Sequence, residues 1–260
     1  MKNLYKISFI GAGKVASALA LATHAKGYRI LKIISPGGRS ASVLAKLCSS
    51  EPGSEYDIPG GTDLAIVSVP DHELQNVAKR IKAGPETLVV HTAGSYGMEV
   101  FPVNKSYRCG VLYPLQTFTR GRNPVLEDVP LFLEAETKSD LEILMSIASS
   151  LSSKVFTVDL ETRRRMHLAA VFACNFVNHM LTAAESITAE SSLDFNVFET
   201  LVRETIDKAF MLGPGSSQTG PAVRNDLNTI EKHLDLLSFS PQLKEVYKAV
   251  TESIIKTYTH

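Results

Sequence analysis

Two glycines and an alanine near the start of the chain have the spacing of a phosphate-binding turn. The sequence reads Gly11-x-Gly13-x-x-Ala16, between an apolar run and a segment rich in small residues. Gly11 would permit a tight turn, Gly13 would let the backbone approach a pyrophosphate, and Ala16 would keep a following helix close to the strand. The free N–H groups of that helix would face the phosphates. The spacing predicts a dinucleotide site, whose contacts we expect to include Gly11, Ala12, Gly13, Lys14, Val15, Val69 and Pro70.

Residues further along the chain indicate which dinucleotide this is. An NAD site usually carries an Asp or Glu about 20 residues past the glycines, where it bonds the ribose 2′-hydroxyl. This chain has Ser35 there, followed by Arg39 and Ser40. A hydroxyl and a guanidinium suit a 2′-phosphate, which an arginine can hold with two hydrogen bonds. The pattern favours NADP over NAD. The alternative is that Arg39 is a solvated loop residue and that Ser35 only starts a turn.

A polar stripe on an otherwise apolar helical segment could supply the proton that accompanies hydride transfer. Hydride transfer to a C=O or C=N bond needs a proton donor nearby, and histidine titrates near neutrality. We therefore predict His167 as the acid/base and Asn175 as the residue that orients the substrate or the nicotinamide amide. The alternative for His167 is a satisfied structural histidine. At α-helical spacing one face would carry His167, Val171, Asn175, Asn178, His179 and Thr182.

Six further polar residues are candidate substrate contacts, because they follow predicted strands or lie in a loop that enters a helix. Ligands of open α/β sheets lie beyond the carboxyl ends of the strands. Three of the candidates have a structural alternative: His91 and Ser95 could complete a loop, and Arg224 could pair with Asp226 or Glu231. Asp226 or Asn225 could cap the following helix. The six candidates are His91, Ser95, Tyr113, Gln116, Thr219 and Arg224.

The elements that must position these residues alternate between strand and helix in the first part of the chain. This alternation predicts an α/β fold with a doubly wound parallel sheet. The expected strands are 5–10, 29–34, 63–69, 87–92, 109–112, 129–134 and 155–158, and the expected helices are 14–26, 40–49, 72–82 and 138–151. We expect Asp71 to cap the third of these helices, and segment 49–62 to be a surface connection.

After residue 159 the pattern is helical, with expected helices at 160–190, 196–212, 226–237 and 241–258. We therefore predict two domains, a nucleotide-binding domain over 1–158 and an all-helical domain over 159–260 for substrate binding and dimerisation.

Composition excludes several classes of partner. The chain has 260 residues, equal numbers of basic and acidic side chains, and no long run of one charge, so we expect no nucleic-acid surface. No apolar run is long enough to span a membrane, and the N-terminus lacks the character of a signal peptide. The three cysteines are scattered and do not have the spacing of a zinc site. We expect no metal site and a cytoplasmic protein.

Together the motifs resemble the 6-phosphogluconate dehydrogenase-like superfamily, near pyrroline-5-carboxylate reductase and the F420-dependent NADP oxidoreductases. More specifically, the chain is similar to Rossmann-like candidate NADP oxidoreductases with a C-terminal helical domain of unknown function. The resemblance implies an active site in a cleft between the two domains and a homodimer formed through the helical domain, although a monomer is the alternative. The motifs that carry it are Tyr113-Pro-Leu-Gln-Thr-Phe118, the helix from His167 to His179, and Thr219-Gly-Pro-Ala-Val-Arg224-Asn-Asp226 with His233.

The chain departs from the related hydroxyacid dehydrogenases at one position. Those enzymes carry a Lys and an Asn four residues apart on this helix. If Asn175 matches that Asn, Val171 stands where the Lys would be; the other possible pairing is Asn175 with His179. The expected function is an NADP(H)-dependent oxidoreductase acting on a small polar carbonyl, imine or hydroxyl compound. The alternatives are an imine reductase similar to pyrroline-5-carboxylate reductase and a catalytically silent NADP-binding sensor or interaction protein.

Overall fold

The chain folds into two compact units. The computed structural model describes residues 5–119, 125–189 and 191–258. One unit comprises Met1–Cys174 and the other Asn175–His260. This division lies within the helical half of the chain, after the position at which the strand pattern ends. The predicted domains 1–158 and 159–260 stay a prediction.

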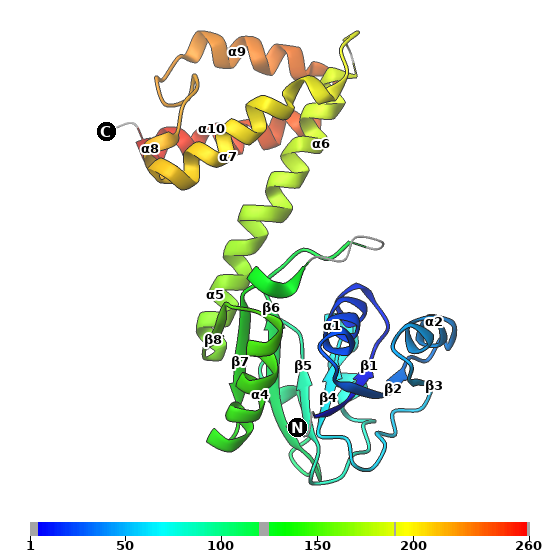
Figure 1. The fold of residues 1–260 in the computed structure, drawn as a ribbon. Coiled ribbons are helices and arrows are strands. Elements are labelled where there is room, and N and C mark those ends of the chain that lie inside the picture. Colours follow the sequence, from blue (N-terminus) through cyan, green and yellow to red (C-terminus); the bar gives the residue numbers. More distant parts are fainter. Residues whose placement is uncertain (1–4, 120–124, 190, 259–260) are drawn as a thin grey trace. The chain divides into compact units, whose positions relative to one another are not determined.

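The first unit is built on a single sheet of eight strands, in the order β3-β2-β1-β4-β5-β6-β7-β8 (Figure 1). All neighbouring strands pair in parallel except β6 and β7. The doubly wound α/β fold is therefore confirmed. The strands are β1 (Lys6–Ile10), β2 (Arg29–Ile34), β3 (Glu51–Gly53), β4 (Leu64–Val67), β5 (Leu88–His91), β6 (Arg108–Pro114), β7 (Leu131–Ala135) and β8 (Val155–Thr157).

Two features of the sheet differ from the sequence prediction. Segment 49–62 is not only a surface connection, because β3 forms within it and pairs with β2 at the edge of the sheet. Its three residues, which include Pro52, have no apolar pattern that would have revealed it. The antiparallel β6–β7 pair arises because the described residues between the two strands form no α-helix, and a parallel connection usually needs a crossover helix.

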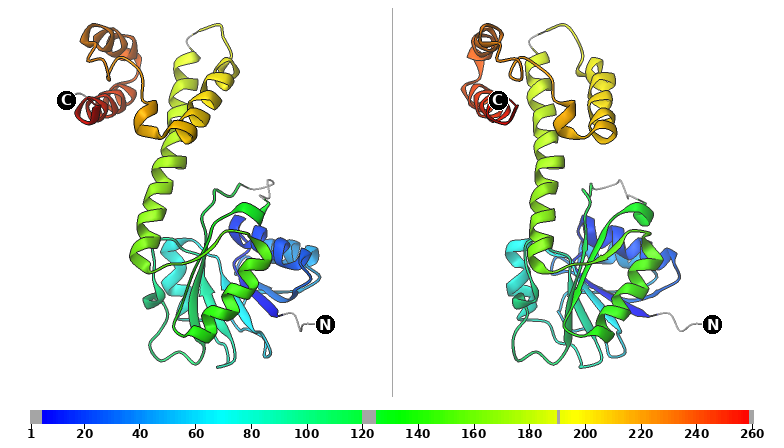
Figure 2. Two further views of the ribbon diagram at one scale, coloured as in Figure 1. Left: turned by 60° about the vertical axis from the view of Figure 1, so that its left-hand side comes forward. Right: turned by 90° about the vertical axis from the view of Figure 1, so that its left-hand side faces the viewer.

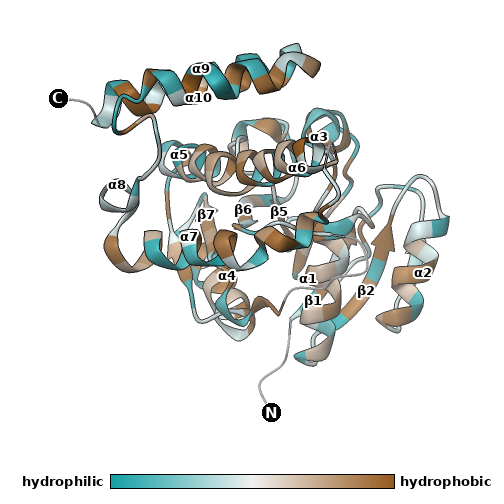
Figure 3. Cartoon of the chain, turned by 90° about the horizontal axis from the view of Figure 1, so that it is seen from above, coloured by the Kyte–Doolittle hydropathy of each residue, from teal (hydrophilic) through white to brown (hydrophobic). Residues whose placement is uncertain are grey.

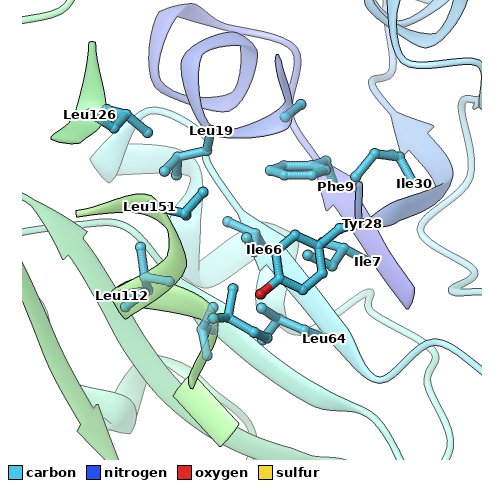
Figure 4. Close-up of a cluster of buried hydrophobic side chains, with 14 of the residues drawn as sticks. Ile7, Phe9, Leu19, Tyr28, Ile30, Leu64, Ile66, Leu112, Leu126 and Leu151 are labelled. Carbon is cyan, nitrogen blue, oxygen red and sulfur yellow. The ribbon is translucent and has the colours of Figure 1, made fainter. Parts of the chain in front are cut away.

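Helices cover both faces of the sheet (Figure 2). On one face Leu19, Leu44 and Leu144 pack with Phe9 in a buried apolar cluster, part of which Figure 4 shows. On the other face Leu74 belongs to a second cluster. Burying each such side chain contributes roughly 1.5–3 kcal/mol. The helices of these faces are α1 (Lys14–Ala25), α2 (Arg39–Leu47) and α4 (Lys138–Leu151) on the first, and α3 (Asp71–Ala78) on the second.

The rest of the chain is helical, as expected, but the predicted helix 160–190 is interrupted. A π-helical segment, Val171–Phe176, separates α5 (Leu160–Ala170) from α6 (Val177–Thr188), and residue 190 lies outside the described residues. The remaining helices are α7 (Glu199–Leu212), α8 (Pro214–Ser217), α9 (Leu227–Leu236) and α10 (Pro241–Tyr258), with 3₁₀ turns at Met98–Val100, Leu126–Asp128, Phe195–Phe198 and Leu237–Phe239. None of the helices in the described part of the chain combines the length and hydropathy of a bilayer-crossing segment.

The π-helical segment corrects the spacing argument for a shared polar face. The predicted face requires 3.6 residues per turn from His167 to Thr182. A π-turn closes hydrogen bonds from i to i+5, so residues beyond it are rotated relative to those before it. His167 and Val171 keep the α-helical relationship up to the start of the segment. Asn178 and His179 do not follow the assumed spacing.

Helix caps match the prediction at one of two places. The Asp226 side chain accepts a hydrogen bond from the Thr229 N–H at 3.1 Å and caps α9, as expected. Asp71 does not cap α3: Pro70 occupies the cap position, and Asp71 is the first helical residue, with no capping hydrogen bond. Its carboxylate still lies in the first turn, where the helix dipole favours a negative charge.

Candidate functional site

The glycine turn has the geometry that a dinucleotide-binding turn requires. Gly11 has φ +107°, and its N–H donates to the Ile34 carbonyl at 2.7 Å. An added Cβ would lie 2.0 Å from the Ser68 carbonyl oxygen, so only glycine fits. A Cβ at Gly13 would meet no atom within 4 Å, and no side chain caps α1 there. Ala16 is fully buried. The first N–H groups of α1 are therefore open to an anion.

Two hollows flank this turn. The first hollow, of about 300 Å³, has Gly11, Ala12, Gly13, Ser35, Val69 and Pro70 among its lining residues. The second hollow, of about 810 Å³, has Ala12, Gly13, Lys14, Arg39 and Ser40 among its lining residues. All the predicted cofactor contacts except Val15 thus line one hollow or the other. The Val15 side chain packs against the apolar cluster on the α1 face instead.

The second hollow offers cations to a ligand. Lys14 and Arg39 line it, and none of the Asp or Glu residues that the structure describes does. Arg39 is the first residue of α2, whose cap position is Gly38 and which has no capping side chain. Within the described residues no acid pairs with Arg39 or Lys14. A second open helix N-terminus therefore lies beside two cations, an arrangement that attracts anions.

Ser35 starts the turn into α2 and also lines a hollow, and its contact with the cofactor stays a prediction. Its carbonyl accepts a hydrogen bond from the Gly38 N–H at 2.9 Å, which makes the turn into α2. Its side chain is half-buried, and the residue lines the first hollow.

His91 is held inside the protein rather than presented to a ligand. Its ring is fully buried; Nε2 donates to the Gly97 carbonyl, and Nδ1 accepts from the Ala93 N–H, both at 3.2 Å. Burial first, and the Arg163 charge second, lower the pKa of His91 to about 4. The ring is neutral with its hydrogen on Nε2. Of the two roles left open at His91, the structure favours completion of the loop over contact with substrate.

Tyr113 and His167 form a hydrogen-bonded pair within the first unit. The Tyr113 hydroxyl lies 2.8 Å from His167 Nδ1, and the two rings meet edge to face with centroids 5.8 Å apart. Tyr113 is the last residue but one of β6 and is buried, whereas His167 lies on α5 and is half-buried. Burial first, and the Asp71 carboxylate second, raise the pKa of Tyr113 to about 12. The hydroxyl stays protonated at neutral pH.

Gly94, in loop 92–97 after β5, makes room for this pair. An added Cβ would lie 2.7 Å from His167 Nδ1 and 2.9 Å from Tyr113 Cζ. Both distances are far shorter than a normal contact. The lack of a side chain at Gly94 therefore permits the loop and the two rings to approach.

Two arginines attach α5 to the same loop. Arg163 is fully buried; it pairs with Glu134 on β7 and donates to the Tyr96 carbonyl at 2.6 Å. Arg164 donates from Nε to the Ser95 carbonyl at 2.8 Å. Arg163 is not among the predicted site residues, because nothing in the run 163–165 distinguishes a buried arginine from its exposed neighbours. These contacts position His167 relative to the carboxyl ends of β5 and β6.

The other predicted substrate contacts within the first unit are partly engaged. The Ser95 side chain is half-buried, while its carbonyl is used by Arg164. Gln116 is exposed, and its Oε1 accepts from the Thr117 N–H at 2.8 Å. Their contacts with substrate stay predictions.

Three predicted residues belong to the second unit. Asn175 is exposed within the π-helical segment, and Thr219 and Arg224 are exposed in the segment between α8 and α9. Among the described residues Arg224 forms no ion pair with Asp226 or Glu231, the alternative considered for it. The orienting role of Asn175 and the substrate contacts of Thr219 and Arg224 stay predictions.

Two family models match the chain. One, described as NADP oxidoreductase coenzyme F420-dependent, matches residues 6–94, and the other, a domain of unknown function called DUF2520, matches residues 129–254. A crystal structure of a protein from Bacteroides fragilis, described as a candidate NADP oxidoreductase, is 38% identical in sequence and has a TM-score of 0.88. The match covers 97% of this chain and 98% of the other chain.

More distant structures share the fold. A reductive aminase from Aspergillus terreus in complex with NADPH and ethyl-5-oxohexanoate is 12% identical, covers 98% of this chain with 94% of its own, and has a TM-score of 0.72. A pyrroline-5-carboxylate reductase from Coxiella burnetii is 18% identical and has a TM-score of 0.58. The match covers 98% of this chain and 97% of the reductase chain. A comparison with curated proteins gave no match.

Proposed function

Because the chain belongs to the family that joins a coenzyme F420-dependent NADP oxidoreductase domain to a DUF2520 domain, we propose that it is an NADP(H)-dependent oxidoreductase. It transfers a hydride to or from a small polar carbonyl, imine or hydroxyl compound. The observation that carries this proposal is the open N-terminus of α1 at Gly13, where an added Cβ would meet no protein atom. The cofactor, when bound, supplies or accepts the hydride at its nicotinamide ring.

The residues of the two hollows would hold different parts of the cofactor. Gly11, Ala12 and Gly13 would hold the pyrophosphate, because Ala12 and Gly13 line both hollows and Gly11 lines the first. Arg39, with Ser40 and Lys14, would hold the 2′-phosphate, because Lys14 and Arg39 line the second hollow and none of the described acidic residues does. A guanidinium can bind a phosphate with two hydrogen bonds, whereas the 2′-hydroxyl of NAD has no charge to pair with it.

His167 is the proton donor to the substrate. The ring lies on α5 beside the carboxyl ends of β5 and β6, the edge at which open α/β sheets bind ligands. Among the described residues Nε2 has no hydrogen-bond partner, and it is not among their buried side-chain nitrogens without a partner. That atom is therefore available to a substrate oxygen or nitrogen.

An imine is the substrate class to test first. The fold likeness to a reductive aminase and to a pyrroline-5-carboxylate reductase supports this order. The missing Lys on the helix also speaks against the mechanism of the hydroxyacid dehydrogenases. A donor such as His167 is sufficient for an imine, whose nitrogen takes up a proton more readily than a carbonyl oxygen.

The decisive experiment follows NADPH oxidation by the full chain against small carbonyl and imine compounds. The panel includes pyrroline-5-carboxylate and ethyl-5-oxohexanoate. We expect turnover with at least one compound, and a strong loss of that turnover in His167→Ala. Tight NADPH binding without turnover of any compound would favour the silent sensor instead. Unimpaired turnover in His167→Ala would overturn the acid/base assignment.

We also propose that two chains associate through the helical unit. Among described residues 175–258, the buried ones are Ala222, Ile230, Leu237 and Thr251. Large apolar side chains are exposed on α6 and α7, and Figure 3 shows apolar residues along these helices. A second copy would cover such surface, and two-fold dimers are the commonest closed assemblies. The exposed set includes Met180, Ile187, Leu201, Ile206, Phe210, Met211 and Leu212.

We place the protein in the cytoplasm, with a small-molecule substrate and no nucleic-acid or membrane partner. Cys48, Cys109 and Cys174 are free, which suits a reducing compartment. The formal charge of zero gives no electrostatic footprint for nucleic acid.

A further inference from the structure

The hydrogen bond between Tyr113 and His167 has a direction that can be worked out. Within the described residues the Tyr113 hydroxyl has one hydrogen-bond partner, His167 Nδ1, at 2.8 Å. The residue is 9% exposed, so its O–H hydrogen has little access to water. A buried hydroxyl that does not donate costs about 1–3 kcal/mol. The hydroxyl therefore donates, and Nδ1 accepts.

This direction decides which ring nitrogen carries the hydrogen of a neutral His167. A neutral imidazole has one N–H and one acceptor nitrogen. Since Nδ1 accepts from Tyr113, the hydrogen lies on Nε2. Nε2 is also the ring nitrogen that remains accessible among the described residues. The ring thus presents a donor, not an acceptor, to a ligand.

We propose that Tyr113 is a positioning residue that holds His167 with its hydrogen on Nε2. Tyr113 also supplies a proton to Nδ1 when the Nε2 proton leaves, so that the resting site is ready to reduce a substrate. The inference rests on the proposed function: it identifies Nε2 of His167 as the donor atom and Tyr113 as the residue that positions it. The pair in its resting form can donate to an oxygen or nitrogen that gains charge. It cannot accept a proton at Nε2 until a proton has left the pair.

The proton transfer balances through the two residues. Hydride addition at the substrate carbon moves the π electrons of the C=O or C=N bond onto the oxygen or nitrogen. That atom takes the Nε2 proton while the Tyr113 proton moves to Nδ1, which leaves a neutral ring and a phenolate. An alkoxide or an amine anion is a stronger base than a phenolate, so both transfers run downhill. A solvent proton at Nε2 and return of the Nδ1 proton to the phenolate restore the pair.

The surroundings hold the pair rigidly enough for this role. Gly94 leaves the rings only the space they fill, since an added Cβ would lie within 3 Å of both. Arg163 and Arg164 attach α5 to the carbonyls of Tyr96 and Ser95. A fixed donor needs no reorganisation when charge develops on the substrate, which is where such groups contribute most to catalysis.

The first test reads the tautomer directly and needs no substrate. Histidine in the full chain is labelled with nitrogen-15, and the His167 signals are assigned by their absence in His167→Gln. We expect the hydrogen of the neutral ring on Nε2 in the unmodified chain, and a mixture of tautomers in Tyr113→Phe. A neutral ring with its hydrogen on Nδ1 would overturn the proposal, whether or not the chain turns over a substrate.

The second test separates positioning from binding. With a compound reduced in the NADPH panel, Tyr113→Phe should lower kcat by about tenfold or more, with the KM for NADPH within about twofold of the original. The matched control is Tyr107→Phe, because Tyr107 is also buried and its hydroxyl bonds the Ala78 carbonyl at 3.3 Å. An equal loss in both variants, or no loss in Tyr113→Phe, contradicts the role of Tyr113. A chain that reduces nothing contradicts the proposed function and leaves the tautomer experiment to decide this inference.

Discussion

The backbone at Gly94 and the ring of His167 approach so closely that a methyl group would not fit between them. An ideal Cβ on Gly94 lies 2.7 Å from Nδ1 and 2.8 Å from Cγ of His167. The two residues come from loop 92–97 and from α5, which are far apart in the sequence. The contact ties the position of the proposed proton donor to the loop that follows β5.

Gly94→Ala should therefore displace the His167 ring and lower turnover in the NADPH panel by about tenfold or more. Overpacking of this kind also costs about 1–3 kcal/mol of the free energy of unfolding, measured by urea denaturation. NADPH affinity should change little, because Gly94 does not line either hollow. Gly60→Ala is the control, since a Cβ there meets nothing within 4 Å. Equal turnover in the two variants would show that the ring tolerates displacement.

The choice between NADPH and NADH should depend on Arg39. We expect the full chain to bind NADPH at least about tenfold more tightly than NADH, a difference of about 1.4 kcal/mol. Arg39→Ala should remove most of that difference by weakening NADPH binding alone. Fluorescence titration of both cofactors measures it, with Arg29→Ala as the control because Arg29 is exposed at the opposite end of β2. Equal affinities in the unmodified chain would contradict the assignment of the 2′-phosphate site.

His91 should make the fold less stable in mild acid. Its pKa is lowered from 6.5 to about 4 in the folded chain, so the unfolded chain binds a proton first as the pH falls. Its contribution to stability is present above pH 6.5 and is lost as the pH falls to about 4, a loss of about 3 kcal/mol. His91→Gln does not titrate, so its free energy of unfolding should fall less over this range. Parallel curves for the two chains would show that His91 does not titrate in this way.

Arg163 should be the most costly of the three consecutive arginines to remove. Arg163→Met leaves Glu134 without its partner and frees the Tyr96 carbonyl. Breaking such a pair at a fully buried arginine destabilises a protein by about 3–5 kcal/mol. Arg165→Met is the control, because its i,i+4 pair with Glu161 is exposed and contributes about 0.5 kcal/mol or less. Chemical denaturation of both variants gives the comparison; similar midpoints would contradict the importance of the buried pair. Adding Glu134→Gln to Arg163→Met should recover part of the loss.

The proposed dimer should weaken when an exposed apolar side chain of α7 is made polar. Phe210 is 89% exposed, and Phe210→Ser should raise the dissociation constant by about tenfold or more if a second copy covers it. Val103 in the first unit is also fully exposed, so Val103→Ser should leave association unchanged. Sedimentation at micromolar concentration measures both. Monomers alone in the unmodified chain would remove the dimer proposal.

Local pattern was sufficient for most of the elements. The ranges expected for β2, α4 and α10 agree with those observed, because apolar periodicity and capping residues act over a few neighbouring positions. The glycine turn could also be predicted from local pattern. The Gly-x-Gly spacing predicted a tight turn at Gly11, which has a positive φ, and an open backbone at Gly13. Asp226 caps α9 for the same local reason.

The contacts that build the proposed proton donor were decided only by the tertiary structure. Tyr113 and His167 are 54 positions apart, and no spacing rule joins the end of a strand to a helix that follows two more strands. In the sequence Arg163 is one of three consecutive arginines that could all be solvated. Only the fold shows that it contacts Glu134 and the Tyr96 carbonyl. The sequence by itself determined most of the strands and helices and the cofactor turn, since these depend on neighbouring residues; β3 and the π-helical segment were exceptions. Packing between distant segments decided which polar groups meet, because burial and hydrogen-bond partners are properties of the whole fold.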